Sequence, residues 1–504
     1  MEGGFLDHTP AWRTYHYTGK KKEKVIAGEA TAQQLIAVLE EGNLKYETYF
    51  KLIIATGMRR GECCGLQWGD INWDERSIHI QQNVVKVTGE DIIAKETKTV
   101  AGGRYVYFSL EMVSLLQEFQ RECAWETETY DGRELEDTDY IFRRHGDRLP
   151  MTPSTFAWRF KLILKKHGLP PALNVHSLRH TNASMLIAQG VDVRLIYDGF
   201  GCLTTLPHKY YEELQKKGIK CQVFNPFRPI LNIIQNNRDH RKLCIIDGWV
   251  GFTGGINLAD EYINQKARFG HWKDTAVMLK GEAVWNMTVM FLHMWAVIGR
   301  SEESVDYEAY FPHRYHEEEF ESDGFVQPFC DTPLDEEVVG EDVYLNIINK
   351  AKKYVYICTP YLIIDNEMMT ALCLAAKSGV DVRIMTPGIP DKKLVFILTQ
   401  SYYRQLLEAG VKIYEYQPGF LHAKSFVSDD EIGVVGTINL DYRSLYLHFE
   451  DGVWIYRNRV IQDIKDDFIQ TMEYCRQIEP EFCLNRNIGL RIMQNIFRAF
   501  APLM

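Results

Sequence analysis

The sequence has no long apolar segment. Within 504 residues, no run reaches the ~18 consecutive apolar side chains that a membrane-spanning helix needs. The best candidate, residues 282–299, is interrupted by Glu282, Asn286 and His293, as in a partly buried amphipathic helix. The first 24 residues lack the apolar core and small-residue cleavage site of a secretory signal. We therefore expect neither a transmembrane helix nor a leader peptide.

Paired cysteines are also absent. The 11 cysteines are an odd number, and no two of them are spaced as Cys-x-x-Cys. In a long chain without a secretory signal, this usage predicts reduced thiols. The sequence shows no cluster with metal-ligand spacing, so we predict no metal and no cofactor.

Charge is present in ordinary amounts but is unevenly distributed. The net charge is −11 and 46% of the residues are hydrophobic, which excludes a disordered or collagen-like protein. Residues 301–350 hold 15 acidic residues against two basic ones, a pattern typical of a solvated loop between domains. Residues 151–187 hold five basic residues and no acid. That run indicates either a surface for a polyanion or a solvated helix face.

The chain after residue 187 contains an internal repeat. Four elements recur in the same order, which indicates a duplicated structural unit of the α/β type. The pairs are Ala188-Gln-Gly-Val-Asp-Val-Arg194 with Ala376-Lys-Ser-Gly-Val-Asp-Val-Arg383, His240-Arg-Lys-Leu-Cys-Ile-Ile-Asp247 with His422-Ala-Lys-Ser-Phe-Val-Ser-Asp429, Gly254-Gly-Ile-Asn257 with Gly436-Thr-Ile-Asn439, and Asp274 with Glu450.

The His-x-Lys-x4-Asp motifs suit phosphoryl chemistry. Side chains alternate along a strand, so each motif puts its histidine and lysine on one face. A neutral imidazole can attack phosphorus, and a protonated one can give a proton to the leaving oxygen. Lysine and asparagine donate to phosphate oxygens, and a carboxylate can orient each imidazole. A single motif is more typical of a surface strand, whereas two motifs supply a nucleophile and an acid.

These motifs resemble those of the phospholipase D superfamily and, over about residues 190–504, those of bacterial cardiolipin synthases. The resemblance implies that two phosphatidylglycerols are joined through a phosphohistidine intermediate, with release of glycerol. It implies an anionic phospholipid partner at the cytoplasmic face of a bacterial membrane, bound peripherally because the family's membrane anchors are absent from this sequence. The implied roles are His240 as nucleophile, His422 as general acid, Lys242, Lys424, Asn257 and Asn439 as phosphate ligands, Asp274 and Glu450 as orienting carboxylates, and Asp247 and Asp429 as ties between strands.

The C-terminal segment has an amphipathic pattern. Ile488, Ile492, Ile496 and Phe500 are spaced four residues apart, with arginines interleaved. Such a stripe either lies in a membrane interface or packs into the core.

The first part of the chain has a different pattern. Residues 52–62 are expected to form a helix, a tight turn at Gly57 and a second helix, and residues 92–109 a β-hairpin. The segment His176-Ser-Leu-Arg-His180 follows. Arginine forks grip a phosphodiester at two points, and a nearby lysine or histidine can move protons.

In this order, over about residues 30–187, the patterns resemble the catalytic domain of a tyrosine recombinase (phage integrase). The resemblance implies DNA binding through residues 1–187, with Arg59 and Arg179 on the phosphate, Lys98 on the hairpin, and His176. The family's tyrosine nucleophile is not clearly present. Tyr211 stands near its register, but Pro207 would interrupt the helix there, so we expect this part to be inactive.

The joint between the two parts lacks a piece. A helical run and a strand, residues 342–363, precede the second repeat, whereas the recombinase-like helix 176–184 precedes the first. We expect the first repeat's sheet to lack that strand, leaving an exposed edge or a replacement strand. A natural fusion, a recombination scar and a misjoined reading frame all remain open.

The expected fold is therefore α/β. Residues 1–187 form a mainly α recombinase-like domain with a β-hairpin, and residues 188–335 and 336–504 form two phospholipase D-like repeats packed face to face. The leading function is phosphatidyl transfer, and the alternative is a DNA-binding recombinase remnant with a phosphodiesterase passenger. The sequence leaves the oligomeric state open.

Overall fold

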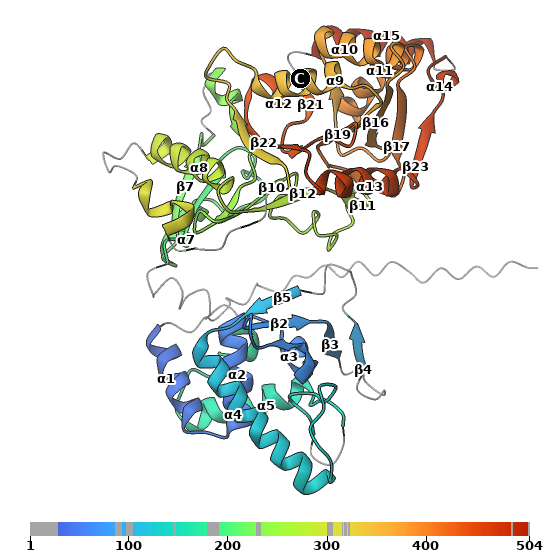
Figure 1. The fold of residues 1–504 in the computed structure, drawn as a ribbon. Helices are drawn as coiled ribbons and strands as arrows, with labels where there is room; N and C mark the ends of the chain where they lie inside the picture. The colour runs from blue at the N-terminus through green and yellow to red at the C-terminus, as the bar shows by residue number, and fades with distance from the viewer. Residues whose placement is uncertain are drawn as a thin grey trace, which may run out of the picture. The chain divides into compact units, whose positions relative to one another are not determined.

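The chain folds into two compact units. The computed structural model describes residues 29–85, 93–96, 104–144, 148–178, 191–227, 233–299, 306–314, 316, 320, 323–484 and 487–501. One unit comprises residues 1–193 with 214–220, and the other comprises residues 194–213 with 221–504 (Figure 1). In the described part, no helix combines the length and apolarity needed to cross a bilayer.

The first unit is mainly α-helical. Its core is aromatic: the ring of Tyr49 stacks on that of Phe156 at 3.5 Å, and both side chains are fully buried. Gly57 ends α2 at φ +65°, a left-handed conformation that glycine adopts without strain. The elements are α1 (Glu29–Glu40), α2 (Leu44–Thr56), α3 (Arg60–Cys64), β1 (Ile71–Asn72), β2 (Ser77–Ile80), β3 (Gln82–Val85), β4 (Ile93–Glu96), β5 (Arg104–Tyr107), α4 (Leu110–Glu126) and α5 (Pro153–Lys166).

The hairpin predicted over residues 92–109 does not form as one pair of strands. β4 pairs with β3, while β5 pairs with β2. The register places Val106 of β5 opposite Ile78, which is fully buried. Strand β5 therefore packs its half-buried side on the core through β2 and is not paired with β4.

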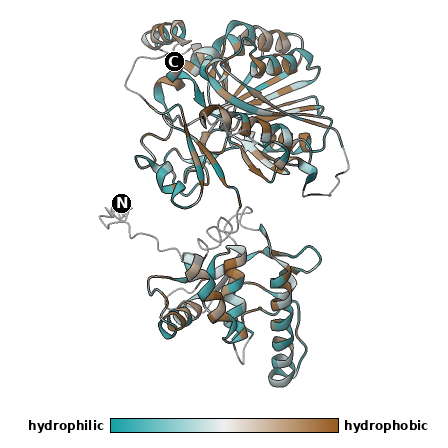
Figure 2. Ribbon diagram, turned by 90° about the vertical axis from the view of Figure 1, so that its left-hand side faces the viewer, coloured by the Kyte–Doolittle hydropathy of each residue, from teal (hydrophilic) through white to brown (hydrophobic). Residues whose placement is uncertain are grey.

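A nine-stranded sheet organises the second repeat, and hydrophobic residues line its strands (Figure 2). Helices α9 (Val339–Lys350), α10 (Asn366–Lys377) and α11 (Lys393–Glu408) enclose the core on one face, and α13 (Val460–Met472) packs on the other. The strand order is β13 (Phe325–Asp331), β22 (His448–Tyr456), β20 (Ile432–Gly436), β19 (Ser425–Ser428), β14 (Tyr354–Cys358), β16 (Asp381–Pro387), β17 (Lys412–Tyr416) and β23 (Cys475–Ile478), with β8 (Arg238–Asp239) also paired to β22.

The first repeat contains fewer of these elements. Its motif strands form a three-stranded sheet in the order β12-β10-β9, and β6 and β7 form a separate pair. In the second repeat, β14 lies between β19 and β16 and joins the corresponding strands into one sheet. Among the described residues, no strand takes that place beside β9. The elements are β6 (Arg194–Asp198), α7 (Tyr210–Gln215), β7 (Lys220–Phe224), β9 (Cys244–Ile246), β10 (Val250–Gly254), β12 (Ala276–Lys280) and α8 (Val284–Gly299).

Two short parallel pairings join the repeats. β8, just before the first motif, pairs with the start of β22 in the second repeat. β18 (Gly419–Leu421), just before the second motif, pairs with β11 (His271–Lys273) in the first repeat. Each motif histidine is therefore held beside a strand of the other repeat.

The C-terminal helix leaves its apolar stripe exposed. In α15 (Ile488–Ala499), Ile492 and Ile496 are 56% and 52% exposed, and Phe500 just beyond it is 54% exposed. The helix is anchored by its other side: Gln494 is buried and donates to the carbonyl of Ile397, and Phe497 packs against the core. Core packing therefore does not account for these three apolar side chains.

Tyr344 of α9 packs on the sheet of the second repeat, and its substitution tests how much α9 stabilises that sheet. Its fully buried ring stacks on Phe426 at 3.9 Å, and its hydroxyl donates to the carbonyl of Ile438. We expect Tyr344→Ala to lower the free energy of unfolding by about 3–5 kcal/mol. Urea unfolding measures the change, and Leu374→Ala at a 59% exposed position of α10 is the control. An effect no larger than that of the control would contradict this role of α9.

Candidate active site

The two motif histidines occupy equivalent positions in the two repeats. His240 follows β8, and its backbone N–H donates to the carbonyl of Phe449 at 2.9 Å. His422 follows β18, and its N–H donates to the carbonyl of Lys273 at 2.7 Å. Because both acceptors belong to the opposite repeat, neither histidine is positioned by its own repeat alone.

Each orienting carboxylate contacts the motif histidine of the other repeat. Nδ1 of His240 lies 2.8 Å from Glu450, and Nδ1 of His422 lies 2.8 Å from Asp274. Both carboxylates are buried, at 0% and 3% side-chain exposure. Ser444, in α12 (Tyr442–Tyr446), donates to Glu450 at 2.6 Å and fixes that carboxylate. An Nδ1–H held this way leaves the lone pair of Nε2 free for chemistry.

The lysines lie beside their own histidines. Nζ of Lys424 donates to the carbonyl of His422 and lies 2.9 Å from its Nδ1, while Lys242 donates to the carbonyl of His240. Burial and the repulsion from Lys242 lower the pKa of Lys424 to about 7, although Asp274 opposes the shift. Burial also lowers the pKa of Lys242. Lys424 is buried and Lys242 is half-buried, and because their charges repel each other the site favours an anion.

The two asparagines differ in their contacts. Asn257 donates to the hydroxyl of Tyr262 at 2.6 Å. Asn439 is 5% exposed, and its Oδ1 has no hydrogen-bond partner among the described residues. Both follow a glycine-rich turn at the end of a motif strand, as the repeat predicts.

The histidines are held in the neutral form. Burial and the nearby Lys424 lower the pKa of His422 to about 3, although Asp274 opposes the shift. Burial also lowers the pKa of His240. Glu450 is ionised: burial raises its pKa, but the facing His240 and His448 outweigh that effect and bring it well below its usual range. Neutral imidazoles beside fixed carboxylates are suited to nucleophilic attack.

The motif aspartates have unequal contacts. Asp429 accepts hydrogen bonds from the backbone N–H groups of Lys352, Lys353 and Tyr354, where β14 begins. Asp247 is exposed and has no hydrogen bond or ion pair within the described segments. Both aspartates have positive φ, +55° and +53°. The two aspartates therefore share a backbone conformation, but only Asp429 holds a neighbouring strand.

Sequence reasoning missed His448. This histidine lies on β22 two residues before Glu450, and its ring centre is 5.7 Å from that of His240. The corresponding residue of the first repeat is Trp272, whose ring centre is 5.4 Å from that of His422. The spacing to the motif acid is the signal that could have found both, because residues two apart on a strand share a face. The two halves of the site are therefore chemically unequal.

His448 also belongs to a group of three side chains whose spacing would suit a metal ion. His240, His448 and Glu450 each place one nitrogen or oxygen within 4.8 Å of the others. Two imidazoles and a carboxylate are ligands that zinc accepts. The motif spacing did not predict this group, because His448 lies outside both motifs.

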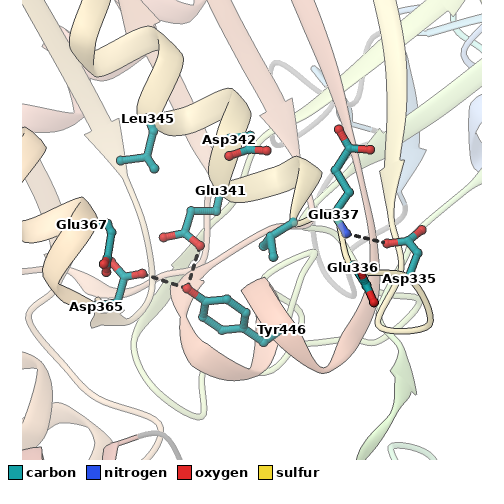
Figure 3. A pocket seen from close by; sticks show the side chains of 10 residues that line it. Asp335, Glu336, Glu337, Glu341, Asp342, Leu345, Asp365, Glu367 and Tyr446 are labelled. Atoms are coloured by element: carbon teal, nitrogen blue, oxygen red, sulfur yellow. Dashed lines mark hydrogen bonds between the residues drawn. The ribbon is translucent and has the colours of Figure 1, made fainter.

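A separate cavity of about 840 Å³ lies in the second repeat and contains no motif residue. Glu341 and Asp365 point toward Tyr446, whose hydroxyl lies 2.6 and 2.8 Å from them (Figure 3). Burial and Asp365 raise the pKa of Glu341 to about 7. The hydroxyl of Tyr446 has one proton and can donate to only one of the two carboxylates. The raised pKa lets Glu341 stay protonated up to about neutral pH, so its carboxyl group can donate the other hydrogen bond. The remaining lining residues are Asp335, Glu336, Glu337, Val338, Asp342, Leu345 and Glu367.

The recombinase-like residues are only partly described. Arg59 precedes α3 and is 58% exposed, with its guanidinium 2.7 Å from Glu62, and His176 is exposed. Lys98 and Arg179 lie outside the described residues. Glu62 is buried and also binds Arg104, which the sequence reasoning missed; these arginines bring the pKa of Glu62 to about 2 despite its burial. Tyr211, on α7, lies 3.3 Å from Glu212.

Comparison with known proteins identifies two families in one chain. Residues 181–295 and 344–472 match the model described as "Cardiolipin synthase, PLD-like domain", and residues 28–212 match that of the phage integrase family.

The relatives match the second part of the chain. An uncharacterized protein of Streptococcus mutans is 50% identical over 318 residues, covering 63% of this chain and 68% of that protein. A cardiolipin synthase of Halalkalibacterium halodurans is 38% identical over 317 residues, covering 63% of this chain and 62% of the enzyme. The structure of phosphatidylserine synthase from Haemophilus influenzae shares 14% identity at a TM-score of 0.48, covering 65% and 85% of the two chains. By the two family models, the chain therefore carries a PLD-like domain of the cardiolipin synthase family over residues 181–295 and 344–472, and a region of the phage integrase family over residues 28–212.

Proposed function

We propose that the chain transfers a phosphatidyl group from one phosphatidylglycerol to another, releasing glycerol and forming cardiolipin. The observation that carries this proposal is the exchange of carboxylates, His240 with Glu450 and His422 with Asp274. A twofold arrangement of two oriented imidazoles supplies both a nucleophile and a proton donor. The similarity to the cardiolipin synthase of Halalkalibacterium halodurans supports the lipid substrate.

In the first step, Nε2 of His240 attacks phosphorus and the P–O bond to glycerol breaks. The leaving oxygen takes a proton from His422, so that glycerol departs neutral. In the second step, the hydroxyl of another phosphatidylglycerol attacks the phosphorus, the P–N bond to His240 breaks and frees the neutral imidazole, and the hydroxyl proton passes to His422. We assign the nucleophile to His240 because its side chain is 26% exposed, against 8% for His422.

His422 takes up a proton from water when the substrate binds. In the site as it stands, the pKa of His422 is about 3, because burial and Lys424 disfavour its charged form. A bound phosphodiester places a negative charge among Lys242, Lys424 and the histidines. That charge offsets the repulsion and stabilises an imidazolium. Substrate binding therefore converts His422 into the protonated form that acts as the general acid.

The exposed stripe of α15 supports a peripheral membrane location. Ile492, Ile496 and Phe500 face away from the core, with Arg498 in the last turn of the helix. Apolar side chains beside arginines suit the boundary between anionic headgroups and acyl chains.

The division of labour between the histidines predicts different mutant phenotypes. His240→Ala should form no phospho-enzyme, because a nucleophile has no substitute. His422→Ala should slow turnover by about 10²–10⁴-fold, the usual contribution of a general acid. The assay is acid-labile label on the protein after incubation with radiolabelled phosphatidylglycerol in detergent micelles. A substrate with a good leaving group should rescue His422→Ala only, and label retained on His240→Ala alone would reverse the assignment.

The low pKa of His422 predicts a pH-dependent stability. Between pH 6.5 and 3 the unfolded histidine binds a proton and the folded one does not, so stability falls as pH falls. Relative to His422→Asn, the unmutated chain should lose up to about 1.4 kcal/mol per pH unit below pH 6.5. Above that pH the difference should be constant. Urea unfolding at pH 5, 6, 7 and 8 measures it, and a flat difference would show that His422 is not buried neutral.

DNA binding by the first unit is the second candidate function. The phage integrase match over residues 28–212 and the basic run 151–187 favour it. Retention of the full chain on duplex DNA should weaken steeply between 50 and 200 mM salt, by about 10-fold or more, because basic side chains displace counterions. A filter-binding titration measures this, with Lys165→Glu and Lys166→Glu in α5 as variants and Lys377→Glu in the second unit as control. Equal retention at all salt concentrations would exclude this function.

A further inference from the structure

One face of the three-stranded sheet in the first repeat is apolar and exposed. Cys244, Phe252 and Met278 lie side by side across β9, β10 and β12 in the paired register. Phe252 is 37% exposed, Met278 is 54% exposed, and Ile246 on the same face is 50% exposed. α8 packs on the opposite face, where Met287 approaches Gly251. The sheet is thus covered on one side only.

The second repeat shows what covers the equivalent face. Phe426, Val434 and Trp454 lie side by side across β19, β20 and β22 in the same register. Phe426 and Val434 are buried at 2% and 0% exposure under α9. The stacked ring of Tyr344 provides the cover, and its hydroxyl bonds the loop beyond β20. A helix therefore occupies this face wherever the repeat is complete.

The edge of the sheet differs in the same way. In the second repeat, β14 pairs antiparallel with β19, from Cys358 opposite Ser425 to Val355 opposite Ser428. In the first repeat, β9 is the edge strand of the sheet that the described residues form, and its Cys244 is exposed. An unpaired edge is a template for another strand.

Asp247 marks where such a strand would begin. Its counterpart Asp429 accepts three backbone N–H groups at the start of β14, and both aspartates have positive φ. Asp247 is exposed, and the described residues offer it no hydrogen bond. A strand added to β9 would bring these N–H donors to the carboxylate.

We propose that this face and edge bind, in trans, a helix–strand segment of a separate polypeptide that is built like residues 338–358. Its amphipathic helix covers Cys244, Phe252 and Met278. Its apolar strand pairs antiparallel with β9, and the N–H groups at the start of the strand bond Asp247. The missing part of the first repeat is thereby replaced from outside the chain.

A second copy of the chain does not fit this surface. The α9 and β14 of that copy are already packed in its own second repeat, since Tyr344 and Val355 are fully buried there. Two β9 edges could pair, and α15 of a second copy has exposed apolar side chains, but no described segment of that copy offers a helix followed directly by an unpaired strand. The occupant therefore has to bring both elements.

Thiol alkylation tests the proposal without any enzymatic assay. The probe is a synthetic peptide of residues 338–358 with Cys358→Ser, added to the full chain. Cys244 and Cys330 are the two exposed cysteines, and Cys330 lies on β13, in the sheet of the second repeat. We expect saturating peptide to slow maleimide modification of Cys244 at least tenfold and to leave Cys330 unchanged. An unchanged rate at Cys244 overturns the proposal.

Three variants sharpen the test. Phe252→Glu and Asp247→Ala should each weaken peptide binding at least tenfold by fluorescence anisotropy. Leu374→Glu, at a 59% exposed position of α10, should leave it unchanged. All three positions are exposed, and circular dichroism checks folding. Equal binding by Phe252→Glu and by Leu374→Glu refutes docking on this face. Protection of Cys244 that rises with protein concentration without peptide identifies a second copy as the occupant and overturns the proposal.

Discussion

The exchange of short strands between the repeats is the constraint on which the site depends. β8 pairs with β22 and β18 pairs with β11, so each motif histidine is hydrogen-bonded to a carboxylate of the other repeat. The two half-sites cannot be formed separately, because each supplies the orienting group of the other. Loss of either pairing would therefore affect both histidines.

The first repeat is incomplete at some distance from the chemistry. Among its described residues no strand joins β9 to the β6–β7 pair, so these strands form two separate sheets. α8 still covers one face of the three-stranded sheet, and the pairing of β8 with β22 still positions His240. The catalytic geometry thus rests on the interface between repeats, whereas the exposed face of Phe252 and Met278 is a problem of stability and solubility.

The two halves of the site are related by the repeat but are not equivalent. His240 has a second histidine, His448, beside it, whereas His422 has Trp272 and a closer lysine. Burial lowers the pKa of both motif histidines, so the difference between them arises from their neighbours and from the greater exposure of His240.

The sequence by itself predicted the duplicated α/β unit, the motif residues and the missing segment, because repeats and His-x-Lys-x4-Asp spacing are local patterns. Pairing of β4 with β3 was missed, since two candidate partners of similar spacing compete and only packing on Ile78 decides. The sequence left the C-terminal stripe open between core and surface, and the structure exposes it. Only the tertiary structure decided that Glu450 serves His240 and Asp274 serves His422, because contacts between residues 210 and 148 positions apart depend on how the two repeats meet and have no signature along the chain.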